Sequence, residues 1–118
     1  MWVAEFVQKA VAGETCQIDL SPDDQLNMVY INDAIRLISL ILDSESPSYP
    51  VYNTGGHTIS VRDLAALIEE LTGTSVTWNE NAEPWGRPPI VSHSRAAEDF
   101  GYDLTPLSDS ILDYISRL

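Results

Sequence analysis

Apolar side chains between Val51 and Gly73 recur first at strand spacing and then at helix spacing. Val51 and Tyr52 are residue types that favour a strand, and Gly55-Gly56 favours a turn directly after it. A helix is predicted to open at Ser60, whose hydroxyl can accept a hydrogen bond from the first turn, and to end at Gly73 in a left-handed cap. The apolar positions of this helix fall on one face: Val61, Leu64, Ala65, Ile68 and Leu71.

The rest of the pattern predicts four more helices and three more strands. The helices are expected over residues 2–12, 32–43, 94–100 and from Pro106 onward, and the strands over residues 15–20, 28–31 and 75–78. Asp33 is expected to cap the second helix and Thr105 the last one. Helix and strand signals that alternate in this way indicate an α/β fold. We therefore expect a single domain over residues 1–118, with about five helices and four or five short strands in a partly parallel sheet.

The composition argues against two classes of function, nucleic-acid binding and membrane binding. The 118 residues include 18 acidic and 6 basic ones, a net charge of −12. This charge repels phosphate groups and anionic lipid, so we expect neither nucleic-acid nor membrane binding. Cys16 is the only cysteine, and the sequence shows no signal peptide and no long apolar span, so the expected location is cytoplasmic.

Few residues match the patterns of known metal or catalytic sites. His57 and His93 have no cysteine or glutamate at ligand spacing, so no metal site is expected. The sequence contains no Gly-x-Ser-x-Gly elbow of the kind found in serine hydrolases. Gly55-Gly56 fits a tight turn with positive φ or, alternatively, an anion site before a helix.

Three segments together resemble one protein family. Residues 51–73 carry a Tyr-Asn-x-Gly-Gly turn, a Ser-Val-x-x-Leu helix start and a Thr-Gly helix end. Residues 28–41 resemble a Tyr-Val-x-Asp-Val-Ala stretch with Asp33 at the acidic position, and residues 92–106 resemble a closing signature with Phe100-Gly101-Tyr102 at Leu-Gly-Trp. In this order they are similar to the C-terminal, substrate-binding part of extended short-chain dehydrogenase/reductases, the NAD-dependent epimerase/dehydratase family.

The resemblance implies the substrate-binding domain of an NAD(P)-dependent sugar epimerase, dehydratase or reductase. The family's Gly-rich cofactor turn is absent, and so is its Tyr-x-x-x-Lys pair, since Lys9 is the single lysine and no tyrosine precedes it. We therefore expect no catalytic residue and no cofactor site in this chain, while NAD or NADP is implied for the full-length parent. The implied partners are the N-terminal nucleotide-binding half and a small sugar-type substrate.

Three residues are candidates for contacts with that substrate. Arg87 lies near the position where nucleotide-sugar members of the family place an arginine that holds a diphosphate, a role that suits a planar guanidinium. Tyr30 and Asn53 stand at the ends of expected strands and are candidates for lining a pocket. Leu26 occupies the position of a second phosphate-binding arginine, which argues against a UDP- or dTDP-sugar.

The helix expected over residues 32–43 is apolar on nearly all sides, so it should be buried on nearly all sides. The missing cover is expected to be the nucleotide-binding half, and without it the chain should self-associate through an exposed apolar patch. The expected patch members are Leu37, Leu40 and Ile41, or Trp2 and Phe6. The alternative to an enzyme part is a free-standing acidic protein-interaction module without catalytic activity.

Overall fold

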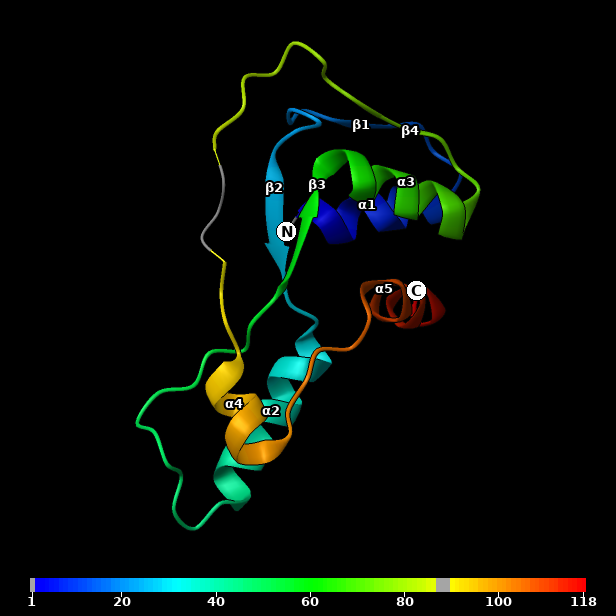
Figure 1. Cartoon of the computed structure of the whole chain (residues 1–118). Helices are drawn as coiled ribbons and strands as arrows, with labels where there is room; N and C mark the ends of the chain where they lie inside the picture. The colour runs from blue at the N-terminus through cyan, green and yellow to red at the C-terminus, as the bar shows by residue number, and fades with distance from the viewer. Residues whose placement is uncertain (1, 87–89) are drawn as a thin grey trace.

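The computed structural model describes residues 2–86 and 90–118 of the chain. The elements follow in the order α1 (Trp2–Val11), β1 (Cys16–Ile18), β2 (Gln25–Met28), α2 (Ile31–Asp43), β3 (His57–Ser60), α3 (Val61–Thr72), β4 (Val76–Trp78), α4 (Ser94–Phe100) and α5 (Leu107–Ser116). The described residues thus form five helices and four short strands, which confirms the predicted α/β composition (Figure 1).

The four strands form two separate pairs. β1 runs parallel to β4, with Cys16 opposite Val76, and β2 runs antiparallel to β3, with Gln25 opposite Ser60. The expected partly parallel arrangement is therefore present as one parallel pair and one antiparallel pair.

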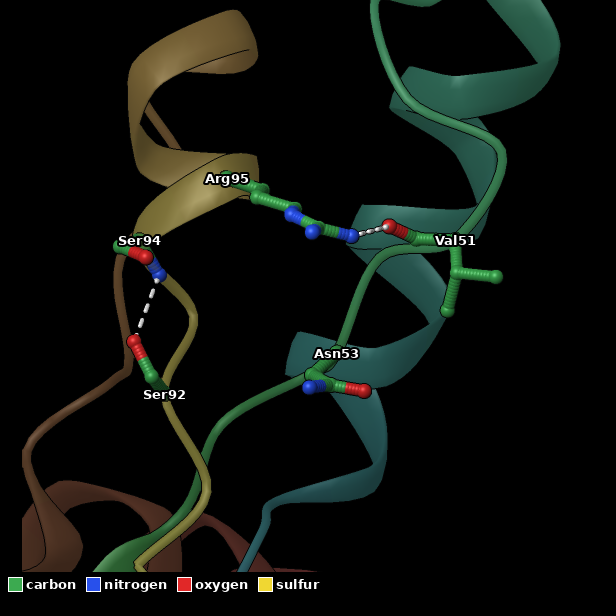
Figure 2. Close-up of a pocket in the computed structure, with 5 residues that line it drawn as sticks. All are labelled: Val51, Asn53, Ser92, Ser94 and Arg95. Carbon is green, nitrogen blue, oxygen red and sulfur yellow. Dashed lines mark hydrogen bonds between the residues drawn. The ribbon is translucent and has the colours of Figure 1, made fainter.

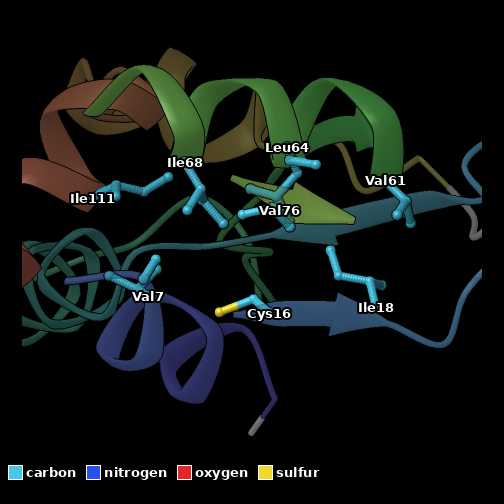
Figure 3. Close-up of a cluster of buried hydrophobic side chains, with 10 residues drawn as sticks. Val7, Cys16, Ile18, Val61, Leu64, Ile68, Val76 and Ile111 are labelled. Carbon is cyan, nitrogen blue, oxygen red and sulfur yellow. The ribbon is translucent and has the colours of Figure 1, made fainter. Parts of the chain in front are cut away.

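Helices α1, α3 and α5 pack with these strands into what we call the main lobe (Figure 3). The predicted inner face of α3 supplies much of the core, because Val61, Leu64 and Ile68 are each almost completely buried. The other buried members are Val7, Ala10, Cys16, Ile18, Ala65, Val76 and Ile111. Full burial of one aliphatic side chain stabilises a fold by roughly 1.5–3 kcal/mol, so this cluster is the main source of stability.

α3 begins and ends where its sequence predicts. Ser60 is the N-cap, and its hydroxyl oxygen accepts a hydrogen bond of 3.1 Å from the Asp63 N–H. Gly73 ends the helix with a φ of +71°, a left-handed conformation that glycine adopts without steric cost. The Glu69 carboxylate accepts a hydrogen bond of 2.7 Å from the Val76 N–H, which ties α3 to β4.

Two predicted strands are placed wrongly. Val51 and Tyr52 belong to no strand, and β3 instead begins at His57, directly before α3. A strand needs a second strand to pair with, and among the described residues no strand pairs with Val51 and Tyr52. The Tyr52 ring packs instead against the Phe100 ring. The strand expected over residues 28–31 lies earlier, as β2, because its partner β3 stands opposite residues 25–28.

α2 and α4 form a second, smaller group, the small lobe (Figure 1). Its buried hydrophobic residues are Leu37, Ala96 and Tyr102. The two lobes give the chain an elongated shape of 49 × 32 × 19 Å. The radius of gyration is 16.3 Å, against about 13.5 Å for a compact domain of this length. No helix in the described part of the chain has the length and apolar character that crossing a membrane requires.

α2 leaves one apolar face uncovered, which we call the α2 face. Its members and their exposed fractions are Ile31 at 64%, Ile35 at 52%, Ile38 at 56% and Leu42 at 78%. The prediction that Leu37, Leu40 and Ile41 form the exposed patch is wrong, because these side chains pack into the small lobe. Phe6 packs against the main core, and the side chain of Trp2 lies outside what the structure describes. The small lobe covers only one side of a helix that is apolar on nearly all sides, so the opposite side remains in solvent.

Candidate functional site

A shallow polar pocket lies between the segment after α2 and the segment that opens α4 (Figure 2). It has a volume of about 270 Å³ and is lined by Val51, Asn53, Ser92, Ser94 and Arg95. Four of these five side chains carry hydrogen-bonding groups, namely one guanidinium, one amide and two hydroxyls. The lining therefore suits a polar or anionic molecule better than an apolar one.

The Arg95 side chain extends from α4 toward the backbone of Val51 (Figure 2). Its guanidinium carbon lies 4.7 Å from the centre of the Tyr49 ring, and one of its nitrogens lies 3.5 Å from the Val51 carbonyl oxygen. Stacking on an aromatic ring orients the planar group. A guanidinium has five N–H donors, so most of them remain available to a bound molecule.

Two acidic residues of α4 bind tyrosines beside the pocket. The Tyr49 hydroxyl donates to the Glu98 carboxylate at 3.2 Å, and the Tyr52 hydroxyl donates to Asp99. The hydrogen bond to Glu98 raises the pKa of the Tyr49 phenol. Burial, and then the hydrogen bond to Asp99, raise the pKa of the Tyr52 phenol. Both phenols are therefore neutral hydrogen-bond donors at neutral pH, and both carboxylates are occupied.

A buried carboxylate fastens the two lobes together. Asp33, in the first turn of α2, is completely buried. It accepts hydrogen bonds of 2.6 Å from the Thr105 hydroxyl and 2.9 Å from the Thr105 N–H. Arg36 lies 3.0 Å from the same carboxylate and also donates to the backbone carbonyl of Asp103. These contacts hold the start of α2 against the segment that leads into α5.

The predicted capping roles of Asp33 and Thr105 are both wrong. The N-cap of α2 is Tyr30 and that of α5 is Pro106, and neither makes a side-chain capping bond. The Asp33 carboxylate and the Thr105 hydroxyl bind each other instead, across 72 residues of sequence. Asp33 and Thr105 thus make one long-range contact with each other instead of the two local capping bonds that the sequence predicts.

The Gly55-Gly56 turn is packed too closely for any other residue. Gly55 has a φ of +70°, and a Cβ at this position would lie 2.6 Å from the His93 ring nitrogen Nδ1. A Cβ on Gly56 would lie 1.9 Å from the Asn27 side-chain oxygen. These contacts favour the interpretation of the glycine pair as a tight turn rather than as an anion site.

Both histidines contact the segment between α4 and α5. His57 Nε2 lies 2.7 Å from the carbonyl oxygen of Thr105, and His93 Nε2 lies 3.2 Å from a carboxylate oxygen of Asp103. The pKa of the Asp103 carboxyl is lowered first by the hydrogen bond from the Leu104 N–H and then by the one from His93. Within residues 2–86 and 90–118, no group of three His, Cys, Asp or Glu side chains is arranged to hold a metal ion.

The three predicted substrate contacts lie in different places. Asn53 lines the pocket, as a binding residue would. Tyr30 stands at the start of α2, where its hydroxyl accepts a hydrogen bond of 2.9 Å from the Asn32 amide, and it does not line this pocket. Arg87 lies outside the described residues. The other four pocket residues are not among the predicted substrate contacts: Val51, Ser92, Ser94 and Arg95.

Comparison with known proteins finds a curated relative and a group of solved structures with the same fold. No family model matches the chain. The mitochondrial L-threonine 3-dehydrogenase of Bos taurus is 25% identical over 126 residues, covering 96% of this chain and 33% of the relative.

Solved structures match nearly the whole chain. A partial consensus L-threonine 3-dehydrogenase has a TM-score of 0.78 at 24% identity, covering 98% of this chain and 41% of its own. The GalE-like L-threonine dehydrogenase from Cupriavidus necator has a TM-score of 0.77 at 25% identity, covering 97% and 40%. The UDP-glucuronic acid 4-epimerase from Bacillus cereus, solved with UDP-glucuronic acid and NAD, has a TM-score of 0.76 at 24% identity, covering 99% and 40%. The chain thus spans about a third of the curated relative and about 40% of these structures.

Proposed function

We propose that this chain, which has the fold of the C-terminal part of extended short-chain dehydrogenase/reductases, supplies the substrate-binding part of an NAD(P)-dependent sugar epimerase, dehydratase or reductase. The match over at least 97% of this chain but only about 40% of the solved enzymes carries the proposal. The remaining part of such an enzyme supplies the nucleotide-binding half and the catalytic residues. The alternative, a free-standing acidic interaction module, is not favoured, because the relatives are enzymes.

Within this proposal the pocket at Asn53 receives a polar part of the substrate. Its lining of amide, hydroxyl and guanidinium groups supports this role, since such groups bind the oxygens of sugars. Arg87 and Tyr30 remain the other two proposed contacts.

The α2 face is the proposed contact with the nucleotide-binding half. Four large aliphatic side chains are at least half exposed on this one helix, more apolar surface than a helix usually leaves in solvent. Burial of each would contribute roughly 1.5–3 kcal/mol, so together they can hold two halves of an enzyme in place.

A cofactor titration tests the proposal that the cofactor site lies in the nucleotide-binding half and not in this chain. The chain alone should give no binding heat with NAD or NADP in a calorimetric titration, because it lacks the Gly-rich turn that lets a backbone approach a pyrophosphate. Binding in the micromolar range with unit stoichiometry would overturn this part of the proposal.

A pair of neighbouring substitutions tests the α2 face. Ile38→Lys places a charge on the face, whereas Ser39→Lys adds the same charge to an exposed residue one position further along α2. With the nucleotide-binding half expressed as a separate polypeptide, I38K should weaken association by at least about tenfold, the equivalent of losing one buried isoleucine, and S39K should leave it nearly unchanged. Equal affinities of I38K and S39K would exclude the α2 face as the contact.

A further inference from the structure

Arg95 differs from the other basic residues that the structure describes. In a chain with 18 acidic residues, a basic side chain readily finds a carboxylate partner. Four of them do so within 3.4 Å, in the pairs Lys9–Glu5, Arg36–Asp33, Arg62–Asp23 and Arg117–Asp113. Arg95 has no carboxylate partner within residues 2–86 and 90–118, although it is exposed on a helix.

Among the described residues, Arg95 lacks a carboxylate partner because the nearest acidic residues of its helix bind other groups. Glu98 and Asp99 stand three and four residues after Arg95, the spacing at which helical ion pairs form. Glu98 instead accepts a hydrogen bond from Tyr49, and Asp99 accepts from Tyr52 and from the backbone N–H of Ser48. Neither carboxylate forms an ion pair with Arg95 in the described residues, and the guanidinium instead stacks on the Tyr49 ring beside the pocket.

We propose that the pocket beside Arg95 binds an oxyanion, a carboxylate or a phosphate carried by a small molecule. The guanidinium supplies a fixed positive charge with N–H donors in a planar fork, which matches the oxygens of either group. The Asn53 amide and the Ser92 and Ser94 hydroxyls supply further donors in the same pocket. The volume of about 270 Å³ admits a small anionic group rather than a whole cofactor.

The site is formed entirely by residues of this chain. Binding at Arg95 therefore does not require the proposed nucleotide-binding half. Failure of an anion to bind would leave the proposed enzyme role intact, and failure of the α2 face to bind its partner would leave the anion site intact.

Anion titrations followed by nuclear magnetic resonance test the proposal. The backbone amide signals of the full chain are followed while inorganic phosphate or acetate is added, with sodium chloride keeping the ionic strength constant. Saturable shifts with a midpoint on the order of 1 mM should be centred on Asn53, Ser92 and Arg95. Saturation by phosphate alone, by acetate alone or by both identifies the group bound. Linear shifts with both anions, or an equal response to chloride, would overturn the proposal.

Two variants distinguish anion binding in the pocket from a general effect of surface charge. Arg95→Gln should weaken binding by roughly tenfold or more, the effect of losing a hydrogen bond to a charged group. Arg62→Gln is the matched control, because Arg62 also stacks on an aromatic ring, 5.3 Å from the centre of Trp78, but is paired with Asp23. R62Q should bind as the unchanged chain does, whereas equal losses in R95Q and R62Q would mean that only net charge matters.

Discussion

Replacing Asp33 by asparagine should loosen the contact between the two lobes. The Asp33 carboxylate is completely buried and accepts both hydrogen bonds from Thr105. Asparagine keeps the shape but has a single acceptor oxygen, so one Thr105 donor faces an NH₂ group. A buried donor left without a partner costs about 1–3 kcal/mol, and truncation to alanine, which removes both acceptor oxygens of Thr105 and the carboxylate beside Arg36, should cost more than the asparagine substitution. A domain of ordinary stability has roughly 5–15 kcal/mol in total, so either loss is large.

Urea unfolding, followed by circular dichroism and by tyrosine and tryptophan fluorescence, measures how far D33N lowers the free energy of unfolding. Asp43→Asn is the control, since Asp43 is an exposed carboxylate at the end of the same helix and should change stability by less than about 0.5 kcal/mol. Thr105→Val removes only the hydroxyl donor, and combined with D33N it should show a coupling energy of about 0.5–3 kcal/mol. If D33N were as stable as D43N, the carboxylate would not be what fastens the lobes. The single domain predicted over residues 1–118 further requires that both lobes of the unchanged chain unfold in one transition.

Three further outcomes follow from the structure. Ser60→Ala removes the N-cap of α3 and should lower the free energy of unfolding by about 1 kcal/mol, measured by urea titration, whereas no change would mean that water replaces the cap. Burial, and then the charge of Asp33, raise the pKa of the Tyr102 phenol. Its contribution to stability is therefore complete below the ordinary phenol pKa of about 10 and is lost as pH rises through the higher folded-state value, a decline that unfolding measured from neutral to alkaline pH should show. The chain should self-associate through the α2 face, more strongly at high salt because salt screens its net charge of −12, and sedimentation should find the Ile35→Lys variant monomeric. A monomeric unchanged chain at both high and low salt would contradict that last prediction.

Features encoded locally were the ones that the sequence predicted well. The start of α3 at Ser60 and its end at Gly73 depend on a hydroxyl and on a left-handed glycine, both of which act on their immediate neighbours. The inner face of α3 was equally predictable, because the spacing of its apolar side chains is a property of the helix itself.

Features that depend on distant residues were predicted less well. Val51 and Tyr52 have strand-forming side chains but no strand to pair with in the described residues, and propensity contains no information about a partner. The Asp33–Thr105 contact joins residues far apart in sequence, so the capping interpretation was the only local one available.

The pocket was only partly predictable for the same reason. Asn53 was selected from its position at the end of an expected strand, whereas Arg95 becomes informative only once Glu98 and Asp99 are seen to bind tyrosines from another segment. An arginine without a carboxylate partner, in a helix that contains two acidic residues, can be recognised only after the contacts of its neighbours are known.

The parallel pairing of β1 with β4 has a consequence for how the chain reaches its native state. Cys16 pairs with Val76, so the two strands meet only after a loop of some 60 residues has closed. Closing such a loop costs roughly 3–4 kcal/mol of chain entropy, and contacts of this range slow folding. During synthesis, β1 emerges from the ribosome long before β4 exists, and the apolar side chains of Cys16 and Ile18 have no strand beside them in that interval. The nascent chain therefore has its greatest tendency to aggregate before residue 78 is made, and the completed chain should refold slowly for its size.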